Sequence, residues 1–161
     1  THDLFIAITY LQLNKVRERL YNEAKNKGYR LANYISSKAF FWQNVQIGDN
    51  VFIFEDNTVQ PFVKLGSNIV LWSGNHIGHH STIKNHCFVS SHVVISGHCN
   101  VEENCFIGVN STIGNNINIA RDNLIGLGCV LNKDTEENKV YMGNPAVPLK
   151  VSAKRLMKVQ E

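Results

Sequence analysis

Branched aliphatic residues recur at every sixth position from residue 47 to residue 131, and the frame is never interrupted. Ile, Leu and Val make up 42 of the 161 residues. Fifteen matches in one fixed frame therefore have a chance probability on the order of 10⁻⁹. A fixed repeat of this length predicts a repetitive, solenoid-like architecture. The fifteen positions are Ile47, Ile53, Val59, Leu65, Leu71, Ile77, Ile83, Val89, Ile95, Val101, Ile107, Ile113, Ile119, Ile125 and Leu131.

A second inward position lies two residues before each aliphatic and holds a small or aliphatic side chain, as at Val45, Asn57 and Ser81. Because strand side chains alternate between faces, this pattern predicts short strands that turn a corner once per repeat. Gly, Asn, Asp and Ser follow the aliphatics and tolerate tight corners. Three repeats make one turn of a triangular prism, so residues three repeats apart stack at about 4.8 Å. We expect a mainly β protein, a parallel β-helix of about five coils.

The two ends of the chain depart from the repeat. Residues 4–9 predict a short buried strand, and an amphipathic helix follows that ends at Gly28. Residues 29–35 predict a second strand. We expect a partial α/β fragment over residues 1–40, the β-helix over residues 41–133, and a closing loop with a capping helix over residues 134–161, with Ser152 as N-cap. The chain begins almost on a strand and without Met, which suggests that an upstream portion is missing.

All four cysteines occupy the small inward position of the repeat, which explains them as buried apolar side chains. Cys87 and Cys105 lie three repeats apart and should stack within disulfide distance. Nothing in the sequence indicates an oxidising compartment, so we expect free thiols. The other two are Cys99 and Cys129.

The formal net charge of +3 is concentrated at the ends. Residues 1–40 carry seven Lys or Arg, residues 41–132 only three, and the remainder six. Without a basic stripe or an aromatic ladder along the coils, nucleic-acid binding is not indicated. The chain has no long apolar run and no signal-peptide pattern, so we expect a cytoplasmic protein that does not bind membranes. The basic ends are suited to an anionic small molecule.

Six of the seven histidines lie between residues 76 and 98, and none is at an inward position. Four of them occupy corners, where His, like Asn, tolerates a left-handed backbone and simply fills the turn. Alternatively, outward imidazoles line a groove between two prisms. A metal site is the third interpretation and needs three convergent ligands. Of the corner histidines, only His80 and His98 stack directly. The six are His76, His79, His80, His86, His92 and His98.

The stretch Ile77-Gly-His-His-Ser-Thr-Ile83, the segment 104–111 and the closing Gly143-Asn-Pro-Ala146 resemble a family of bacterial hexapeptide-repeat sugar acetyltransferases. These are the sialic acid O-acetyltransferases and nucleotide-sugar N-acetyltransferases. The segment Phe5–Ile8 and the following helix resemble half of that family's sugar-nucleotide-binding domain, so the resemblance covers nearly the whole chain. The resemblance implies a left-handed parallel β-helix, a homotrimer, acetyl-CoA as co-substrate and no metal. The implied acceptor is a sugar or a nucleotide-activated amino sugar in bacterial surface-glycan biosynthesis.

The same resemblance implies roles for individual residues. His79 corresponds to the general base, because a near-neutral imidazole can take a proton from an attacking amine or hydroxyl. No covalent acyl-enzyme is needed. His80 stands where the family usually has Asp or Glu to orient the ring. The backbone N–H of Gly97 corresponds to the group that polarises the acetyl carbonyl.

Cofactor contacts follow from the last coil and the C-terminus. Gly126 and Gly128 would let the pantetheine arm approach the backbone. The family's Lys after the closing motif is Val147 here, so we expect Lys150, or else Lys154 or Arg155, to meet the CoA phosphates. A second substrate-contacting histidine of the family is replaced by Phe88. Two other functions stay open: a β-helix scaffold without catalysis, and a metal-dependent lyase or hydrolase built from the histidine cluster.

Overall fold

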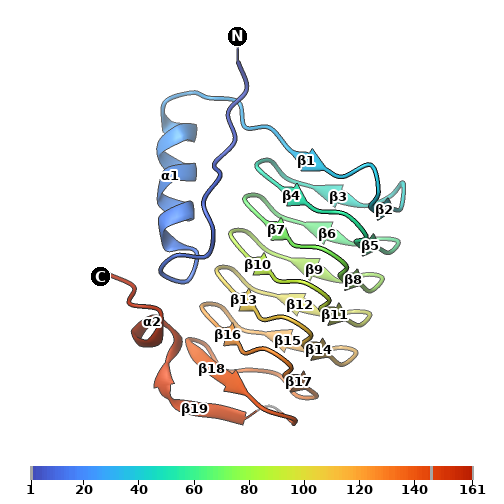
Figure 1. The fold of residues 1–161 in the computed structure, drawn as a ribbon, viewed down its shortest axis with the longest axis vertical. Helices are drawn as coiled ribbons and strands as arrows, with labels where there is room; N and C mark the ends of the chain where they lie inside the picture. The colour runs from blue at the N-terminus through green and yellow to red at the C-terminus, as the bar shows by residue number, and fades with distance from the viewer. Residues whose placement is uncertain (1, 146, 161) are drawn as a thin grey trace.

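The computed structural model describes residues 2–145 and 147–160 and forms a parallel β-solenoid of about six turns. Figure 1 shows the coils stacked along the long axis, with a helix and an extended N-terminal segment along one side and a hairpin at the far end. The predicted fold class, a mainly β left-handed parallel β-helix with small additions at both ends, is confirmed.

Three sheets form the sides of the prism. The eight-stranded sheet contains β1 (Tyr34–Ile35), β4 (Phe52–Ile53), β7 (Val70–Leu71), β10 (Phe88–Val89), β13 (Phe106–Ile107), β16 (Leu124–Ile125), β18 (Lys139–Met142) and β19 (Val147–Ser152). The six-stranded sheet contains β2 (Phe40–Phe41), β5 (Thr58–Val59), β8 (His76–Ile77), β11 (Val94–Ile95), β14 (Thr112–Ile113) and β17 (Val130–Leu131). The five-stranded sheet contains β3 (Gln46–Ile47), β6 (Lys64–Leu65), β9 (Thr82–Ile83), β12 (Asn100–Val101) and β15 (Asn118–Ile119).

The register is the predicted one. Ile77 of β8 pairs with Ile95 of β11, and Val101 of β12 pairs with Ile119 of β15, each pair being separated by three repeats. From Ile53 to Leu131 every aliphatic of the frame is buried. The four cysteines are buried in the same core and are free thiols, as expected.

The coils begin earlier and end later than the aliphatic frame indicates. Strands β1 and β2 already pair in parallel with β4 and β5, within or next to the segment assigned to the N-terminal fragment. Their inward residues, Ile35 and Phe41, continue the six-residue frame, but an aromatic residue breaks the aliphatic pattern. At the other end Val140 of β18 pairs in parallel with Leu124, although the chain between them is shorter than a full turn of the frame. These strands turn the expected five coils into about six.

The third residue after each frame aliphatic forms a corner of the coil. At every such corner from residue 50 to residue 128 the backbone is left-handed. His80, His86, His92 and His98 have φ between 57° and 64°, like the Asn and Asp residues at equivalent corners. The corner-filling interpretation of these histidines is therefore confirmed for the backbone. Even Phe62 adopts this conformation, with φ 62°.

The N-terminal segment contains α1 (Lys15–Asn26), close to the predicted helix. The expected strand over residues 4–9 is wrong: the segment makes only a single parallel bridge, Leu4 to Leu31. Its side chains instead lie on the outer face of the eight-stranded sheet, where the Phe5 ring contacts Phe52 at 5.4 Å. A strand needs a partner along its whole length, and the described residues provide one only at Leu4.

Arg17 fixes α1 to the solenoid. Its guanidinium is fully buried and donates hydrogen bonds to the main-chain oxygens of Asn68 (3.2 Å), His86 (3.0 Å) and Cys87 (3.0 Å). Burial lowers the pKa of Arg17 to about 10. The Asn68 and His86 carbonyls lie at equivalent corners of successive coils, so one side chain joins two coils to the helix.

Strand β19 runs antiparallel to β18 and is followed by α2 (Ala153–Leu156). The Ser152 hydroxyl accepts a hydrogen bond from the Arg155 N–H at 3.2 Å, which confirms the predicted N-cap. The helix ends at Leu156, before the end of the chain's basic C-terminal segment. Ala146, the last residue of the closing motif, lies outside the described residues. Among the described residues, neither helix is long and apolar enough to span a bilayer.

Candidate functional site

The corner between the six-stranded and five-stranded sheets carries three exposed histidine side chains that lie close together. His79 and His80 follow β8 at this corner, and the equivalent residues of neighbouring coils lie one turn before and after them. We call this column the histidine corner. It consists of Gln60, Phe62, His79, His80, Gly97, His98 and Asn115.

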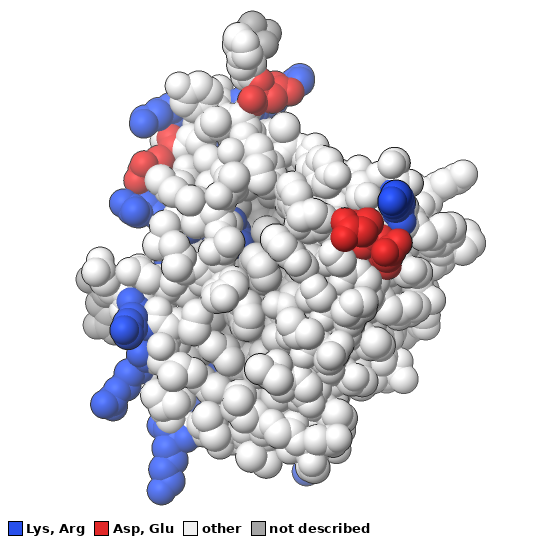
Figure 2. All heavy atoms as spheres, viewed as in Figure 1, with Lys and Arg blue, Asp and Glu red and all other residues white. Residues whose placement is uncertain are grey.

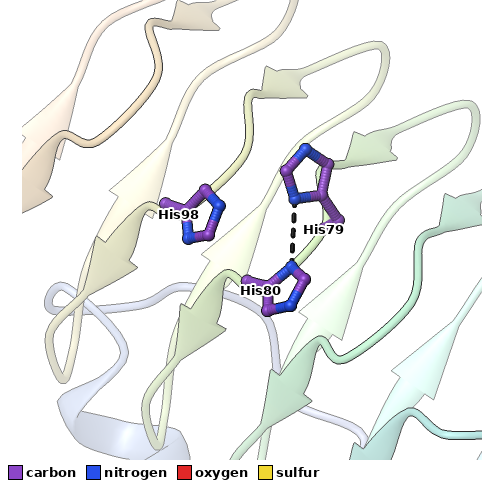
Figure 3. A group of neighbouring side chains, drawn as sticks. All are labelled: His79, His80 and His98. Atoms are coloured by element: carbon purple, nitrogen blue, oxygen red, sulfur yellow. Dashed lines mark hydrogen bonds between the residues drawn. The ribbon is translucent and has the colours of Figure 1, made fainter.

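Figure 3 shows the imidazoles of His79 and His80 facing each other, with His98 alongside from the next coil. The Nδ1 atoms of His79 and His80 are 3.1 Å apart. One of these atoms must donate a proton and the other accept it, since two lone pairs would repel. If His79 donates, its Nε2 carries the free lone pair that a general base requires. The main-chain N–H of His79 donates to Gln60 Oε1 at 3.0 Å.

His80 is held by aromatic contacts on both faces. Its ring stacks on Phe62 with 4.7 Å between centroids and on His98 with 4.8 Å. The three residues occupy the same place in successive coils and share the left-handed corner backbone, so the stack follows directly from the coil repeat. The ring of His79 stands edge-on to both His80 and His98. His80 is therefore a well-positioned neighbour for the His79 ring.

Gly97 lies directly beside the His79 imidazole in the next coil, as the predicted stacking requires. A Cβ at this position would come within 2.8 Å of the His79 atoms Cε1 and Nε2. The absence of a side chain at Gly97 thus makes room for the His79 ring. Its N–H, which by the family resemblance would contact the acyl carbonyl, donates here to Asn115 Oδ1 at 3.0 Å. An acyl oxygen would have to replace this amide oxygen.

The remaining predicted site residues lie elsewhere on the chain. Gly126 and Gly128 precede β17, whereas His79 follows β8, and both strands run parallel in the six-stranded sheet. The glycines and the histidine therefore occupy opposite edges of that sheet. The end of the flexible Met142 side chain lies beside Gly126, so a pantetheine arm that approaches this glycine has to displace it. Gly128 has a φ of 64° and open space around it.

Lys150 lies exposed in β19, close in sequence to the basic residues of α2. Lys154 Nζ forms a salt bridge with Asp122 Oδ2 at 3.3 Å. Figure 2 shows charged side chains along the edge that holds α1, α2 and β19 and a second charged cluster at the opposite edge near the first coils, with a broad uncharged face between them. The basic C-terminal residues predicted from the sequence are thus separate from the histidine corner.

Sequence reasoning missed three members of the histidine corner, although a usable signal was present. Gln60, Phe62 and Asn115 lie about one turn of the solenoid from His79, His80 and Gly97 respectively, and the coil repeat stacks residues at that spacing. His98 was expected to stack on His80 but was not expected to converge with His79. The structure brings one ring nitrogen from each of the three histidines within 4.8 Å of one another, all on exposed side chains.

No protein-family model and no curated protein matches the chain. Solved structures do. A variant of perosamine N-acetyltransferase from Caulobacter crescentus, in complex with CoA and GDP-perosamine, superposes with a TM-score of 0.87 and 23% identity over 91% of this chain and 69% of its own. The acetyltransferase domain of PglB from Neisseria gonorrhoeae, in complex with acetyl coenzyme A, superposes with a TM-score of 0.87. The two are 21% identical over 91% of this chain and 70% of the PglB domain's chain.

An N-acyltransferase from Bacillus cereus, AntD, in complex with dTDP and coenzyme A, is similar at a lower level. It gives a TM-score of 0.72 and 17% identity over 85% of this chain and 91% of its own. The chain shares its fold with hexapeptide-repeat sugar acetyltransferases.

Proposed function

We propose that this protein is an acetyl-CoA-dependent acetyltransferase that acts on a sugar or a nucleotide-activated amino sugar. The observation that carries the proposal is the His79 ring, which faces His80 at 3.1 Å and lies over Gly97. The fold shared with acetyltransferases whose structures contain CoA or acetyl-CoA supports the same activity.

The chemistry is direct transfer. The acceptor nitrogen or oxygen attacks the thioester carbonyl carbon while His79 Nε2 takes the proton from it. The carbon–sulfur bond then breaks, and the imidazolium returns the proton to the CoA thiolate. Atoms and charge balance without a covalent acyl-enzyme. His80 accepts the Nδ1–H of His79 and keeps the Nε2 lone pair available for the acceptor's proton.

The developing oxyanion needs a fixed donor. The Gly97 N–H lies beside the His79 ring, and it becomes available when the Asn115 amide turns away. One such donor typically contributes 10²–10³ in rate. The Asn115 side chain is exposed, so this rotation meets little steric resistance.

Acetyl-CoA is a long molecule, so we expect it to contact more than one corner of the prism. We infer a homotrimer in which the edge of one prism that carries His79 faces the opposite edge of a neighbour, which carries Gly128. This arrangement joins groups that lie on opposite edges of the six-stranded sheet in one chain. Lys150 and Arg155, both exposed, then offer positive charge to the CoA phosphates. Cytoplasmic location and a role in surface-glycan biosynthesis stay predictions.

Two measurements test the proposal. Acetyl-CoA should raise the melting temperature in a thermal-shift titration, because a ligand of the native state stabilises it. Release of CoA thiol should then be screened with free amino sugars and with nucleotide-activated amino sugars as acceptors. An unchanged melting temperature together with no thiol release for any acceptor would favour the scaffold function instead.

A further inference from the structure

The histidine corner also has the geometry of a transition-metal site. The Nδ1 atoms of His79 and His80 are 3.1 Å apart, and a nitrogen of His98 completes a trio within 4.8 Å. Zinc binds imidazole nitrogen at about 2.0–2.1 Å, so two ligands of a tetrahedral ion lie about 3.3 Å apart. The His79–His80 spacing already matches this distance.

The surroundings of the trio favour a cation. Among the residues that the structure describes, no Asp or Glu forms an ion pair with these three rings, so their lone pairs are not committed to a charged partner. The corner segments 60–62, 78–80, 96–98 and 114–116 contain no Lys or Arg that would repel an ion. Neutral imidazole is a preferred ligand of zinc and of copper, nickel and iron.

Two small movements convert the observed arrangement into a three-ligand site. The proton between the two Nδ1 atoms must move to the Nε2 of its own ring, because zinc binds the free lone pair of a neutral imidazole. His98 must rotate out of its stack on His80, and its side chain is exposed and free to turn. Phe62 continues to hold the other face of His80. A water molecule completes the fourth position.

We propose that His79, His80 and His98 form a reversible zinc site that switches off acetyl transfer. Bound metal occupies a nitrogen of His79 and breaks the His79–His80 hydrogen bond, so proton transfer by this ring and metal binding exclude each other. The inhibitory part of this inference rests on the proposed function, whereas zinc binding itself does not.

The first test is isothermal calorimetry with zinc chloride on the untagged full chain, in a buffer without chelators or thiols. We expect one zinc ion per chain. His98→Asn should weaken binding by at least about 10-fold, because second-shell losses alone cost about 10–100-fold. Asn fits this corner, since Asn104, Asn110 and Asn116 hold the same left-handed conformation. His2→Asn is the matched control, since His2 is exposed and lies in the N-terminal segment, outside the coils.

The outcomes separate clearly. Zinc binding that is lost in His98→Asn and kept in His2→Asn supports the site. Binding unchanged in His98→Asn, lost in both variants, or absent from the wild type overturns it. The second test is thiol release with and without zinc, each variant compared with its own metal-free rate. Zinc should inhibit the wild type and His2→Asn but not His98→Asn. A protein that binds zinc but never transfers acetyl groups would refute the proposed function and leave the metal site standing.

Discussion

The Nδ1 atoms of His79 and His80 lie 3.1 Å apart at one corner of the solenoid, and this contact joins a proposed base to a second imidazole. The family that the sequence resembles usually has Asp or Glu at the second position. A carboxylate would stabilise the imidazolium form of the base, whereas a neutral imidazole only orients it. The pH response of the proposed acetyl transfer should therefore depend on residue 80.

His80→Asp tests that dependence. Asp56 and Asp122 have the same left-handed corner conformation, so the substitution fits the backbone. A carboxylate beside His79 stabilises its protonated form, and the rate of transfer should begin to fall at a higher pH as the solution is acidified. His80→Asn is the matched neutral control and should lower kcat without moving the profile. Identical pH–rate profiles for the two variants would show that residue 80 does not act through His79.

Gly97→Ala tests the packing beside the base. The added Cβ would come within 2.8 Å of the His79 ring and push it from its place. The value of kcat/KM should therefore fall by at least about 10-fold, as for other small misplacements of catalytic groups. Gly114→Ala is the control from the next coil, where a Cβ meets nothing closer than 3.4 Å. Equal activity of the two variants would mean that the position of the His79 ring does not limit the reaction.

Arg17→Met tests how α1 is anchored. The main-chain oxygens of Asn68 and His86 would lose their hydrogen bond from Arg17. Each buried unsatisfied group costs about 1–3 kcal/mol, so we expect the free energy of unfolding in urea to fall by about 3 kcal/mol. The control is Arg19→Met, at an exposed site whose partner Glu23 lies 3.9 Å away. It should change this free energy by less than about 0.5 kcal/mol. Comparable losses in both variants would contradict the anchoring role.

His86 gives the protein a predictable acid response. Asn68 Nδ2 donates to His86 Nδ1 at 2.8 Å, because Asn68 Oδ1 already accepts from Asn50. Burial lowers the pKa of His86, an effect that nearby Glu18 opposes and Arg17 reinforces. The unfolded chain therefore binds more protons between the folded pKa and the ordinary value of 6.5, and stability falls as the pH drops through that window.

His86→Asn removes this titration while keeping the corner, since Asn104 holds it in the next coil with φ 59°. The melting temperature of the wild type should fall more between pH 7 and pH 5 than that of the variant. If the melting temperatures of the two proteins fell by the same amount over this pH range, the assignment would be contradicted.

The sequence predicted the core well because each coil places its residues by the same local rule. The spacing of Ile77 and Ile95 specifies inward direction, register and stacking at once. It also placed Gly97 beside His79, since both belong to one corner in successive coils. At Ile35 and Phe41 the rule still held, but Phe41 is aromatic rather than aliphatic, and this change concealed strand β2.

Side-chain conformations and non-repeating contacts could not be predicted in this way. The convergence of His98 on His79 depends on rotamers, which the repeat does not specify. The hydrogen bond from the Gly97 N–H to Asn115 and the position of Met142 beside Gly126 depend on individual side chains. The apolar run over residues 4–9 predicted a strand, but strand formation requires a partner that the described chain supplies only at Leu4.

The most direct test of the account is the rate of acetyl transfer by His79→Ala, measured beside His2→Asn with acetyl-CoA and an amino-sugar acceptor. Loss of a general base should lower kcat by about 10²–10⁴-fold, while the control keeps the wild-type rate. Both variants should retain the melting temperature of the wild type, since both side chains are exposed. Turnover by His79→Ala at the rate of the control would contradict the assignment of His79 as the base.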